Sequence, residues 1–454
     1  MSKNINMTKG NPLKLLVAFA LPLMVGNVLQ SVYSVVDTII VARGAGIAAL
    51  AALGTVDWLN WMPIGIAQGF TQGFSVKMAQ KYGMEDYDGL KHTVGQSASL
   101  SVLIAVIWVV ISQSGLSLCL NLMQVPQNLR GMAEIYTRIL MGGFPVVIFF
   151  NFCSATLRAI GDSKTPLKAM VISSVVNLIL DCVAVFGLKW GIAGAAIATV
   201  ISQCLSGLIC LIKLKKTPIL CFAIQQMKLE RRIYPGLFNL GAPIAFKNII
   251  VALSGMIVQV IVNGFSMGFI AGFTATGKLY GLIEIAAISY GYAVTTYVGQ
   301  NWGAYRFERI KKGLNSAIAL AVMTSISISA VMIIFGEPIT MLFISAEDPA
   351  VFAEACSTAY QYLKFLCYPL PILYLLHIYQ STLQGIGRTT VSLVSGTIEL
   401  VLRVGIAVVV GLTGYEVGIF TAEVAAWIGA EVYLMIVYYR AARRFPDRKP
   451  TESE

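Results

Sequence analysis

Charged residues are scarce in this chain of 454 residues. Asp, Glu, Lys and Arg together make up 12% of the sequence, whereas about a quarter is usual for a soluble domain. Hydrophobic residues make up 57%, and the mean hydropathy is +0.75. This composition excludes an ordinary soluble globular protein and predicts that most of the chain lies in lipid.

Patterns for metal binding and nucleotide hydrolysis are missing as well. The eight cysteines include no C-x-x-C pair, so neither a disulfide framework nor a zinc site is indicated. The G-x-x-x-x-G-K pattern at 272–278 is followed by Leu279, where a phosphate-binding loop requires Ser or Thr. The longest polar segment, 214–233, is too short for a nucleotide-hydrolysing domain. We therefore expect no enzyme activity and no cofactor. Any energy that the protein uses is expected from a gradient of H⁺ or Na⁺ and not from nucleotide hydrolysis.

Apolar stretches of roughly 20 to 30 residues recur along the chain, and each is long enough to cross a hydrocarbon core of about 30 Å as a helix. They are too long and too uninterrupted for barrel strands of about ten residues. The sequence therefore predicts an all-α polytopic membrane protein. Its twelve transmembrane helices are expected at 12–41, 47–80, 88–115, 127–158, 166–187, 191–213, 234–262, 268–299, 307–335, 349–384, 389–411 and 415–440.

Lysines and arginines divide the loops between these helices into two sets. One set, which includes both ends of the chain, is rich in basic residues, and the other contains only Arg43, Arg130 and Lys189. The positive-inside rule places the rich set in the cytoplasm. This topology accounts for the net charge of +11 without nucleic-acid binding. We therefore expect a monomeric, multi-pass protein of the plasma (inner) membrane that contacts the lipid bilayer and has cytoplasmic termini.

The two halves of the chain resemble each other at a spacing of about 220 residues. The sequence AQKYG at 79–83 closes the second helix as GQNWG at 299–303 closes the eighth. Six helices in each half give both halves the same orientation, which predicts lobes related by a pseudo-two-fold axis along the membrane normal. The expected domains are a six-helix lobe at 1–213, a cytoplasmic linker at 214–233, a second lobe at 234–440 and a tail at 441–454.

Two carboxylates in the first half stand inside predicted spans, where a charge costs at least about 2.5 to 3.5 kcal/mol and is usually functional. Asp37 follows Gln30 and Tyr33 in the first helix, and Asp181 ends an N-x-x-x-D sequence in the fifth. The spacing puts Asn177 and Asp181 on one helix face. A carboxylate with an amide suits a proton or a sodium ion. The alternative is that each aspartate pairs with a neighbour or caps a helix.

Charges in the second half favour a structural interpretation. Glu399 and Arg403 are spaced i to i+4 in the eleventh helix, so they can neutralise one another, and we favour a structural pair over a gating or substrate role. A further buried charge network between the lobes is predicted for Lys247, Lys278 and Glu284.

His377 and Asp57 each allow two interpretations. His377 lies deep in a span and is a candidate proton relay, although a hydrogen-bonded core histidine is the more common case. Asp57 stands beside Trp58 and Trp61, which are candidates either for a cation-holding cavity or for an interfacial aromatic belt.

The order and spacing of these motifs resemble the multidrug and toxic compound extrusion (MATE) family along essentially the full length. The resemblance rests on V-D-T at 36–38, N-x-x-x-D at 177–181, the repeated Q-x-aromatic-G motif and the run GAAIAT at 194–199. It implies an antiporter that exports small lipophilic (amphipathic) organic cations in exchange for H⁺ or Na⁺ by alternating access. The alternatives are a lipid-linked oligosaccharide flippase of the same superfamily and a membrane-embedded enzyme.

The resemblance also implies the residues of a cation site in the amino-terminal lobe. Its core ligands for a proton or for Na⁺ would be Asp37, Asn177, Asp181 and Thr199, with Tyr136 and Asn151 of the fourth helix nearby. The sequence departs from the sodium-coupled branch with carboxylates in the seventh and tenth helices, because the seventh span has no acid and the membrane part of the tenth has His377 and no acid. A sodium site of that type in the second lobe is therefore not expected.

Overall fold

The computed structural model describes residues 5–123, 125–344 and 348–445, so the part of the predicted tail at 446–454 lies outside the described residues. The first half of the chain forms helices α1 (Pro12–Ala45), α2 (Ile47–Gly83), α3 (Tyr87–Leu122), α4 (Gln127–Gly142), α5 (Phe144–Ala159), α6 (Lys164–Asp181), the π-helix η1 (Cys182–Gly187) and α7 (Gly191–Lys215). Two 3₁₀ turns, η2 (Pro218–Leu220) and η3 (Ile224–Met227), follow in the predicted linker.

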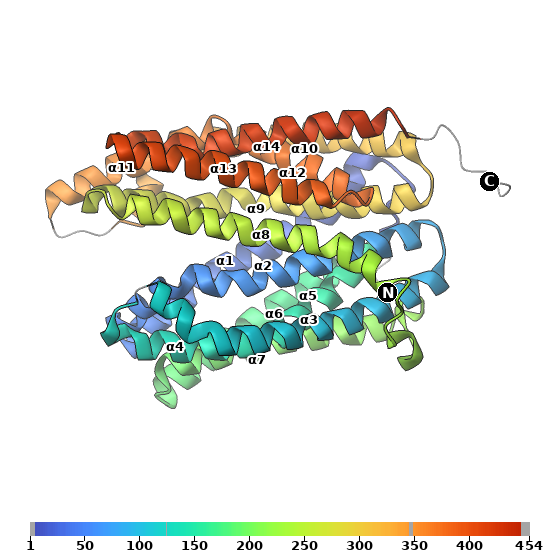
Figure 1. Cartoon of the computed structure of the whole chain (residues 1–454), viewed down its shortest axis with the longest axis horizontal. Coiled ribbons are helices and arrows are strands. Elements are labelled where there is room, and N and C mark those ends of the chain that lie inside the picture. Colours follow the sequence, from blue (N-terminus) through green and yellow to red (C-terminus); the bar gives the residue numbers. More distant parts are fainter. Residues whose placement is uncertain (1–4, 124, 345–347, 446–454) are drawn as a thin grey trace. The chain divides into compact units, whose positions relative to one another are not determined.

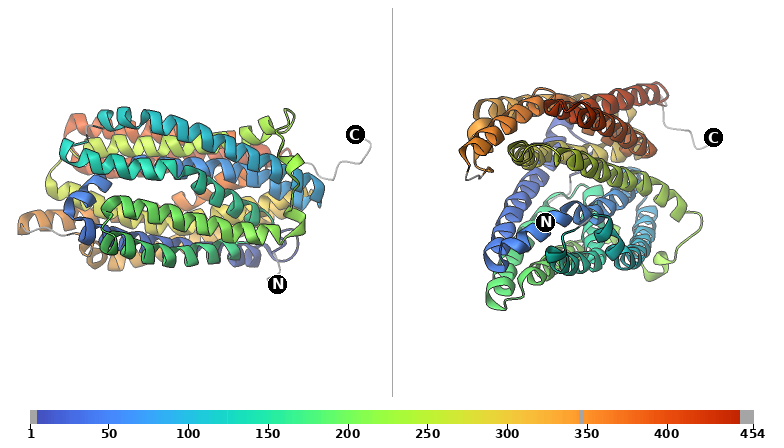
Figure 2. Two further views of the ribbon diagram at one scale, coloured as in Figure 1. Left: turned by 90° about the horizontal axis from the view of Figure 1, so that it is seen from below. Right: turned by 60° about the vertical axis from the view of Figure 1, so that its left-hand side comes forward.

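The second half forms an equivalent series. It contains α8 (Tyr234–Val262), α9 (Met267–Gly303), α10 (Phe307–Met341), α11 (Pro349–Cys367), α12 (Leu370–Gly385), α13 (Thr390–Thr413), the 3₁₀ turn η4 (Glu416–Ile419) and α14 (Phe420–Ala442). Within each half the long helices run side by side along a common direction (Figures 1 and 2). The described residues contain helices and no strand, which confirms the predicted all-α class.

Two of the predicted spans are broken. α4 and α5 are bent by 42° at Gly143, and α11 and α12 are bent by 49° next to Pro369. A proline lacks the N–H that an α-helix needs and clashes with the preceding turn, so Pro145 and Pro369 favour these breaks. If each bent pair is one span, the fourth and tenth predicted helices are both accounted for.

The helices α2 and α9 bury polar side chains against their neighbours. Eight helices, or ten spans with the bent pairs, are long and apolar enough to cross a membrane, and α2 and α9 are not among them. α2 contacts α3, α4 and α5, and α9 contacts α10, α11 and α12. Helices covered by neighbours need little lipid-facing apolar surface. Their buried polar residues include Thr71, Gln72, Thr295 and Gln300.

The chain divides into two compact units. The first contains Leu21–Asn248 together with the start of the chain up to Met7, and the second contains Thr8–Ala20 and the chain from Ile249 onward. Two of the three boundaries, 20/21 and 248/249, fall inside helices α1 and α8, and each of these helices contains a proline, Pro22 and Pro243. The predicted lobe boundaries follow helix order instead and stay a prediction.

Within the first unit, α2 and the start of α8 touch through their backbones. A Cβ atom on Gly73 would lie 2.4 Å from Cα of Gly241, and one on Gly69 would lie 2.4 Å from the backbone of Ala245. Glycine is therefore required on this face of α2, because any side chain would separate the helices.

This contact gives the first prediction. Gly73→Ala should destabilise the protein by about 1 to 3 kcal/mol, because the added methyl group overpacks a backbone contact. Gly115→Ala is the matched control, since that helical glycine in α3 has open space around it and alanine raises helix propensity. The thermal midpoints of the purified proteins in detergent measure both effects. Equal midpoints for the two variants would contradict the contact.

Candidate functional site

Asp181 stands at a change of helix type. It is the last residue of α6, and the six-residue π-helix η1 begins directly after it. Short π-helical turns are rare and are often found at functional sites. A Cβ atom on Gly44 of α1 would lie 2.2 Å from Val185, and one on Gly194 of α7 would lie 2.9 Å from Ala184. The close packing of both glycines on η1 brings α1, α6 and α7 together beside Asp181.

The carboxyl groups of Asp37 and Asp181 face one another at close range, within reach of a shared hydrogen bond once one of them carries a proton. Asp181 and Asn177 are both 0% exposed, and Asp37 is half-buried. Ionised carboxylates accept hydrogen bonds and donate none, so this approach is stable only with a proton or another cation between the two groups. The structure therefore brings together the three residues that the sequence singled out in the first and fifth helices.

The same three residues carry polar atoms that lack a donor or acceptor. Among the described residues no hydrogen-bond partner is found for Oδ1 of Asp37, for either oxygen of Asp181 or for either polar atom of Asn177. Leaving a buried polar group unsatisfied costs about 1 to 3 kcal/mol, so such groups call for a functional explanation. A small cation with its water molecules would satisfy these atoms.

Two tyrosines and a threonine surround the carboxyl pair. Tyr33 lies one turn before Asp37 on α1 and hydrogen-bonds to Thr199 of α7, whose hydroxyl donates to the carbonyl of Ala195 at 3.0 Å. Tyr136 of α4 lies within electrostatic range of both aspartates and of Asp57. Tyr33, Thr199 and Tyr136 thus lie around the carboxyl pair, and a role for them in cation binding stays a prediction.

Other residues proposed for the cavity lie differently. Asn151 donates through Nδ2 to the carbonyl of Val147 in its own helix at 2.9 Å, and Gln30 is exposed on α1. Asp57 is exposed on α2 and interacts with Tyr136, whereas the side chain of Trp58 lies outside the described part. No hydrogen bond of the described residues joins Asn151 or Gln30 to the carboxyl pair.

The second unit contains a separate group of buried charges centred on Arg403. Its guanidinium donates to Oε2 of Glu423 at 2.7 Å and to Oγ of Ser254 at 2.5 Å. Glu399 lies farther away, with Oε2 at 3.9 Å from the guanidinium, and Arg403 and Glu399 are both only 5% exposed. The predicted pair of Arg403 and Glu399 exists, but the closer partner is Glu423 of α14.

The structure gives Glu284 a partner that the sequence left unassigned. Its carboxylate lies 3.2 Å from Nε2 of His377, so this histidine is hydrogen-bonded within the bundle, and a relay role for it stays a prediction. Lys278 is exposed and forms no ion pair among the described residues, because it points away from the packed face of α9. Lys247 is partly buried and belongs to the first compact unit, whereas Glu284 belongs to the second.

Two acids of the last span escaped the sequence reasoning. Glu423 pairs with Arg403, and Glu431 is 5% exposed with no hydrogen-bond partner for either carboxylate oxygen among the described residues. Both stand within α14, so the rule that singled out Asp37 and Asp181 also applies to them. The signal was therefore present in the sequence.

The segment 264–268 has the G-x-S-x-G spacing of a hydrolase nucleophile, which sequence reasoning overlooked. Ser266 caps α9 here: its hydroxyl accepts the N–H of Phe269 at 3.2 Å and donates to Glu354. A nucleophile elbow requires a strand followed by a helix, whereas this turn joins two helices. The serine therefore has a capping role.

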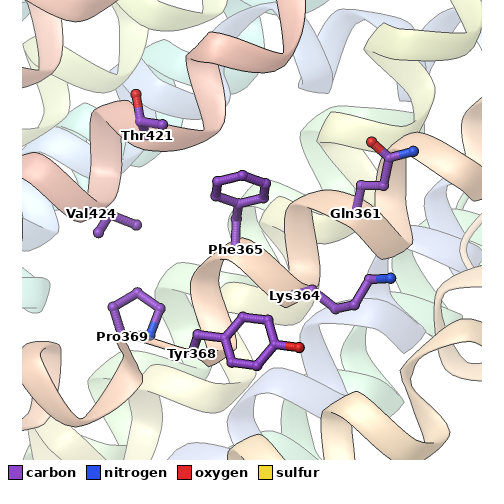
Figure 3. A pocket seen from close by; sticks show the side chains of 7 residues that line it. All are labelled: Gln361, Lys364, Phe365, Tyr368, Pro369, Thr421 and Val424. Atoms are coloured by element: carbon purple, nitrogen blue, oxygen red, sulfur yellow. The ribbon is translucent and has the colours of Figure 1, made fainter.

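A cavity of about 720 Å³ lies between α11 and α14 in the second unit (Figure 3). Phe365 projects from α11 toward Thr421 and Val424 of α14. The ammonium group of Lys364, another lining residue, lies 4.2 Å from the ring centroid of Tyr360. The size suits a drug-like molecule, but the lining offers a fixed positive charge and no carboxylate. This cavity does not provide what a cationic ligand requires.

A resident metal centre is not indicated. Across residues 5–123, 125–344 and 348–445, no group of three or more His, Cys, Asp and Glu side chains is placed to hold a metal ion. The oxygen atoms of Asp37, Asp181, Asn177 and Thr199 are hard ligands of the kind that small cations such as Na⁺ prefer.

The helical fold, with its apolar spans and a buried acidic site, is that of a membrane transporter. The sequence model of the MatE family matches residues 22–183 and 243–409. This chain therefore belongs to the MATE family, as its motifs predict, and its twelve-helix, two-lobe layout fits that fold.

Relatives of known sequence support this assignment. The probable multidrug resistance protein YpnP of Bacillus subtilis is 28% identical over 94% of this chain and 92% of its own length. YoeA of the same organism, also named a probable multidrug resistance protein, is 29% identical over 76% of this chain and 77% of its own. A protein named FAD transporter from Shewanella oneidensis is 23% identical over 86% of each chain.

Solved structures share the fold. A transporter of the MOP superfamily from Pyrococcus furiosus superposes with a TM-score of 0.89 at 23% identity and covers 98% of both chains. A MATE family transporter in an outward-facing conformation superposes with a TM-score of 0.86 at 24% identity, covering 98% of this chain and 99% of its own. Membership of the MATE family, together with the apolar helices, places the protein in a membrane.

The Arg403 group gives the second prediction. Arg403→Gln leaves Glu423 and Glu399 buried without their guanidinium and should destabilise the protein by about 3 to 5 kcal/mol. Adding Glu423→Gln should recover part of this loss, because one uncompensated charge is removed. Arg440→Gln, an exposed arginine of α14, is the matched control. Thermal midpoints in detergent measure all three, and equal values for Arg403→Gln and Arg440→Gln would contradict the network.

Proposed function

We propose that this protein is a secondary active antiporter that exports lipophilic organic cations in exchange for H⁺ or Na⁺ by alternating access. The observation that carries the proposal is the facing pair of Asp37 and Asp181, with the unsatisfied amide of Asn177 beside it. The names of the relatives as probable multidrug resistance proteins support multidrug export.

The exchange follows from the charge of the pair. With both aspartates ionised, the pocket carries two negative charges in a low-dielectric interior and attracts a cation. A proton or Na⁺ that loads the pair removes this charge and therefore weakens the hold on an organic cation. Because coupling between two ligands is reciprocal, the organic cation also displaces the coupling ion. Competition for one charged site is the physical basis of antiport.

The surrounding residues have separate roles in this scheme. Asn177 and Thr199 supply neutral oxygens for a sodium ion, while Tyr33 holds Thr199 through a hydrogen bond. The ring of Tyr136, near both aspartates, offers an aromatic face for an organic cation. We further propose that the protein acts as a monomer in the plasma membrane with both termini in the cytoplasm, as the loop charges favour.

Cargo differs among members of this fold. One relative is named an FAD transporter, and the Pyrococcus furiosus transporter is described as having a binding pocket of reversed polarity that suggests a different function. A flippase for lipid-linked oligosaccharides would need a basic cavity. The paired carboxylates of this chain favour a cationic cargo over an anionic one.

The third prediction tests the carboxyl pair. Asp37→Asn and Asp181→Asn should each abolish ethidium export from cells while expression and thermal midpoint are retained, because the pocket can no longer alternate between charged and neutral states. Asp88→Asn is the control, since this carboxylate is 97% exposed at the start of α3. Export at the wild-type rate in both pocket variants would refute the proposed mechanism.

The fourth prediction concerns the coupling ion. In everted vesicles, an imposed proton or sodium gradient should drive ethidium uptake, whereas ATP with both gradients collapsed should not. Asn177→Leu separates the two ions, because it removes an oxygen ligand needed by Na⁺ and leaves the carboxyl pair that a proton needs. Loss of uptake in this variant assigns Na⁺, and retention assigns H⁺. Uptake driven by ATP alone would exclude secondary transport.

A further inference from the structure

A separate cavity, which contains neither Asp37 nor Asp181, lies where α2 ends and where α3 and α8 begin. Its volume is about 370 Å³, and all of its lining belongs to the first compact unit. Basic side chains line one part of it and aliphatic side chains another. These are Lys77, Lys81 and Arg232 on the basic part and Ile233, Leu237 and Leu240 on the aliphatic part.

The positive charge of this cavity is only partly neutralised. Lys81 pairs with Asp86 at 2.6 Å, and His92, which also lines the cavity, lies 2.9 Å from Glu230. Lys77 and Arg232 have no hydrogen bond or ion pair among the described residues. One lysine and one arginine are therefore left without a counter-charge.

Asp86, the acid beside Lys81, has a structural role at the start of α3. Asp86 caps α3 by accepting the N–H of Gly89 at 2.9 Å. The ammonium group of Lys81 and then this N–H lower the pKa of Asp86, so the carboxyl stays ionised at neutral pH. It cannot turn toward Lys77 or Arg232 without giving up the cap.

We propose that this cavity binds the phosphate headgroup of an anionic phospholipid. Basic pockets between the ends of transmembrane helices attract such headgroups, and these cations lie in the set of segments that the positive-inside rule places in the cytoplasm. The aliphatic part formed by Ile233, Leu237 and Leu240 suits the glycerol and upper acyl groups. A free phosphate ion has the same charged chemistry but would leave this part unused.

Bound lipid would hold the end of α2 and the start of α3 to the start of α8 through one headgroup. A ligand that binds only the folded protein stabilises it, and the stabilisation grows with the logarithm of the ligand concentration relative to Kd. The inference does not depend on the transport mechanism, because it concerns a different cavity and a readout other than export.

The test uses the full-length protein purified in detergent, titrated with phosphatidylglycerol or with phosphatidylcholine. Phosphatidylglycerol should raise the thermal midpoint of the wild type more than phosphatidylcholine does, and the difference should shrink with added salt. Lys77→Gln with Arg232→Gln should weaken phosphatidylglycerol binding by about 30-fold. Lys216→Gln with Arg388→Gln is the matched control, because both residues are exposed outside the cavity.

A further variant should bind phosphatidylglycerol more strongly than the wild type, which misfolding would not produce. Asp86→Asn keeps an oxygen that can cap α3 but frees Lys81, so it should strengthen phosphatidylglycerol binding. Equal binding by the two double variants would overturn the proposal. So would inorganic phosphate that reproduces the stabilisation and competes with the lipid, because the site would then be one for free phosphate.

Discussion

Two carboxyl groups that face each other inside a protein need a cation between them, and the first compact unit of this transporter is arranged around that constraint. Asp37 and Asp181 come from helices far apart in sequence, and the glycines of α1 and α7 that pack on η1 bring them together. Among the described residues, the oxygens of Asp181 and the amide of Asn177 have no hydrogen-bond donor or acceptor. Such a site is incomplete without a cation, which is what a coupling site requires.

The distribution of polar residues among the helices follows from the lipid that surrounds the protein. Helices in contact with lipid need apolar side chains on their outer faces, so polar side chains gather on the helices that other helices cover. α2 and α9 are covered in this way, and both bury polar side chains such as Gln72 and Gln300. Hydropathy alone therefore undercounts the spans of a bundle of this kind.

The acids around Arg403 in the second unit are compensated in a different way. Arg403 lies 2.7 Å from Glu423 and 3.9 Å from Glu399, so these two acids have a guanidinium of the protein beside them. The carboxyl pair of the first unit has no such internal arginine among its described contacts. The pair of Asp37 and Asp181 and the Arg403 group thus differ in how their acids are compensated, although the two units share one helical pattern.

The sequence by itself determined the class of fold, the helical spans and the aspartates worth testing, because length, hydropathy and a charge inside an apolar run are local properties. Only the tertiary structure decided that Glu423 is the closer partner of Arg403, that His377 pairs with Glu284 and that Lys278 is exposed. In a membrane helix both the lipid-facing and the packed faces are apolar, so the pattern of residues does not reveal which face is buried. Contacts between helices therefore depend on packing that no single segment encodes.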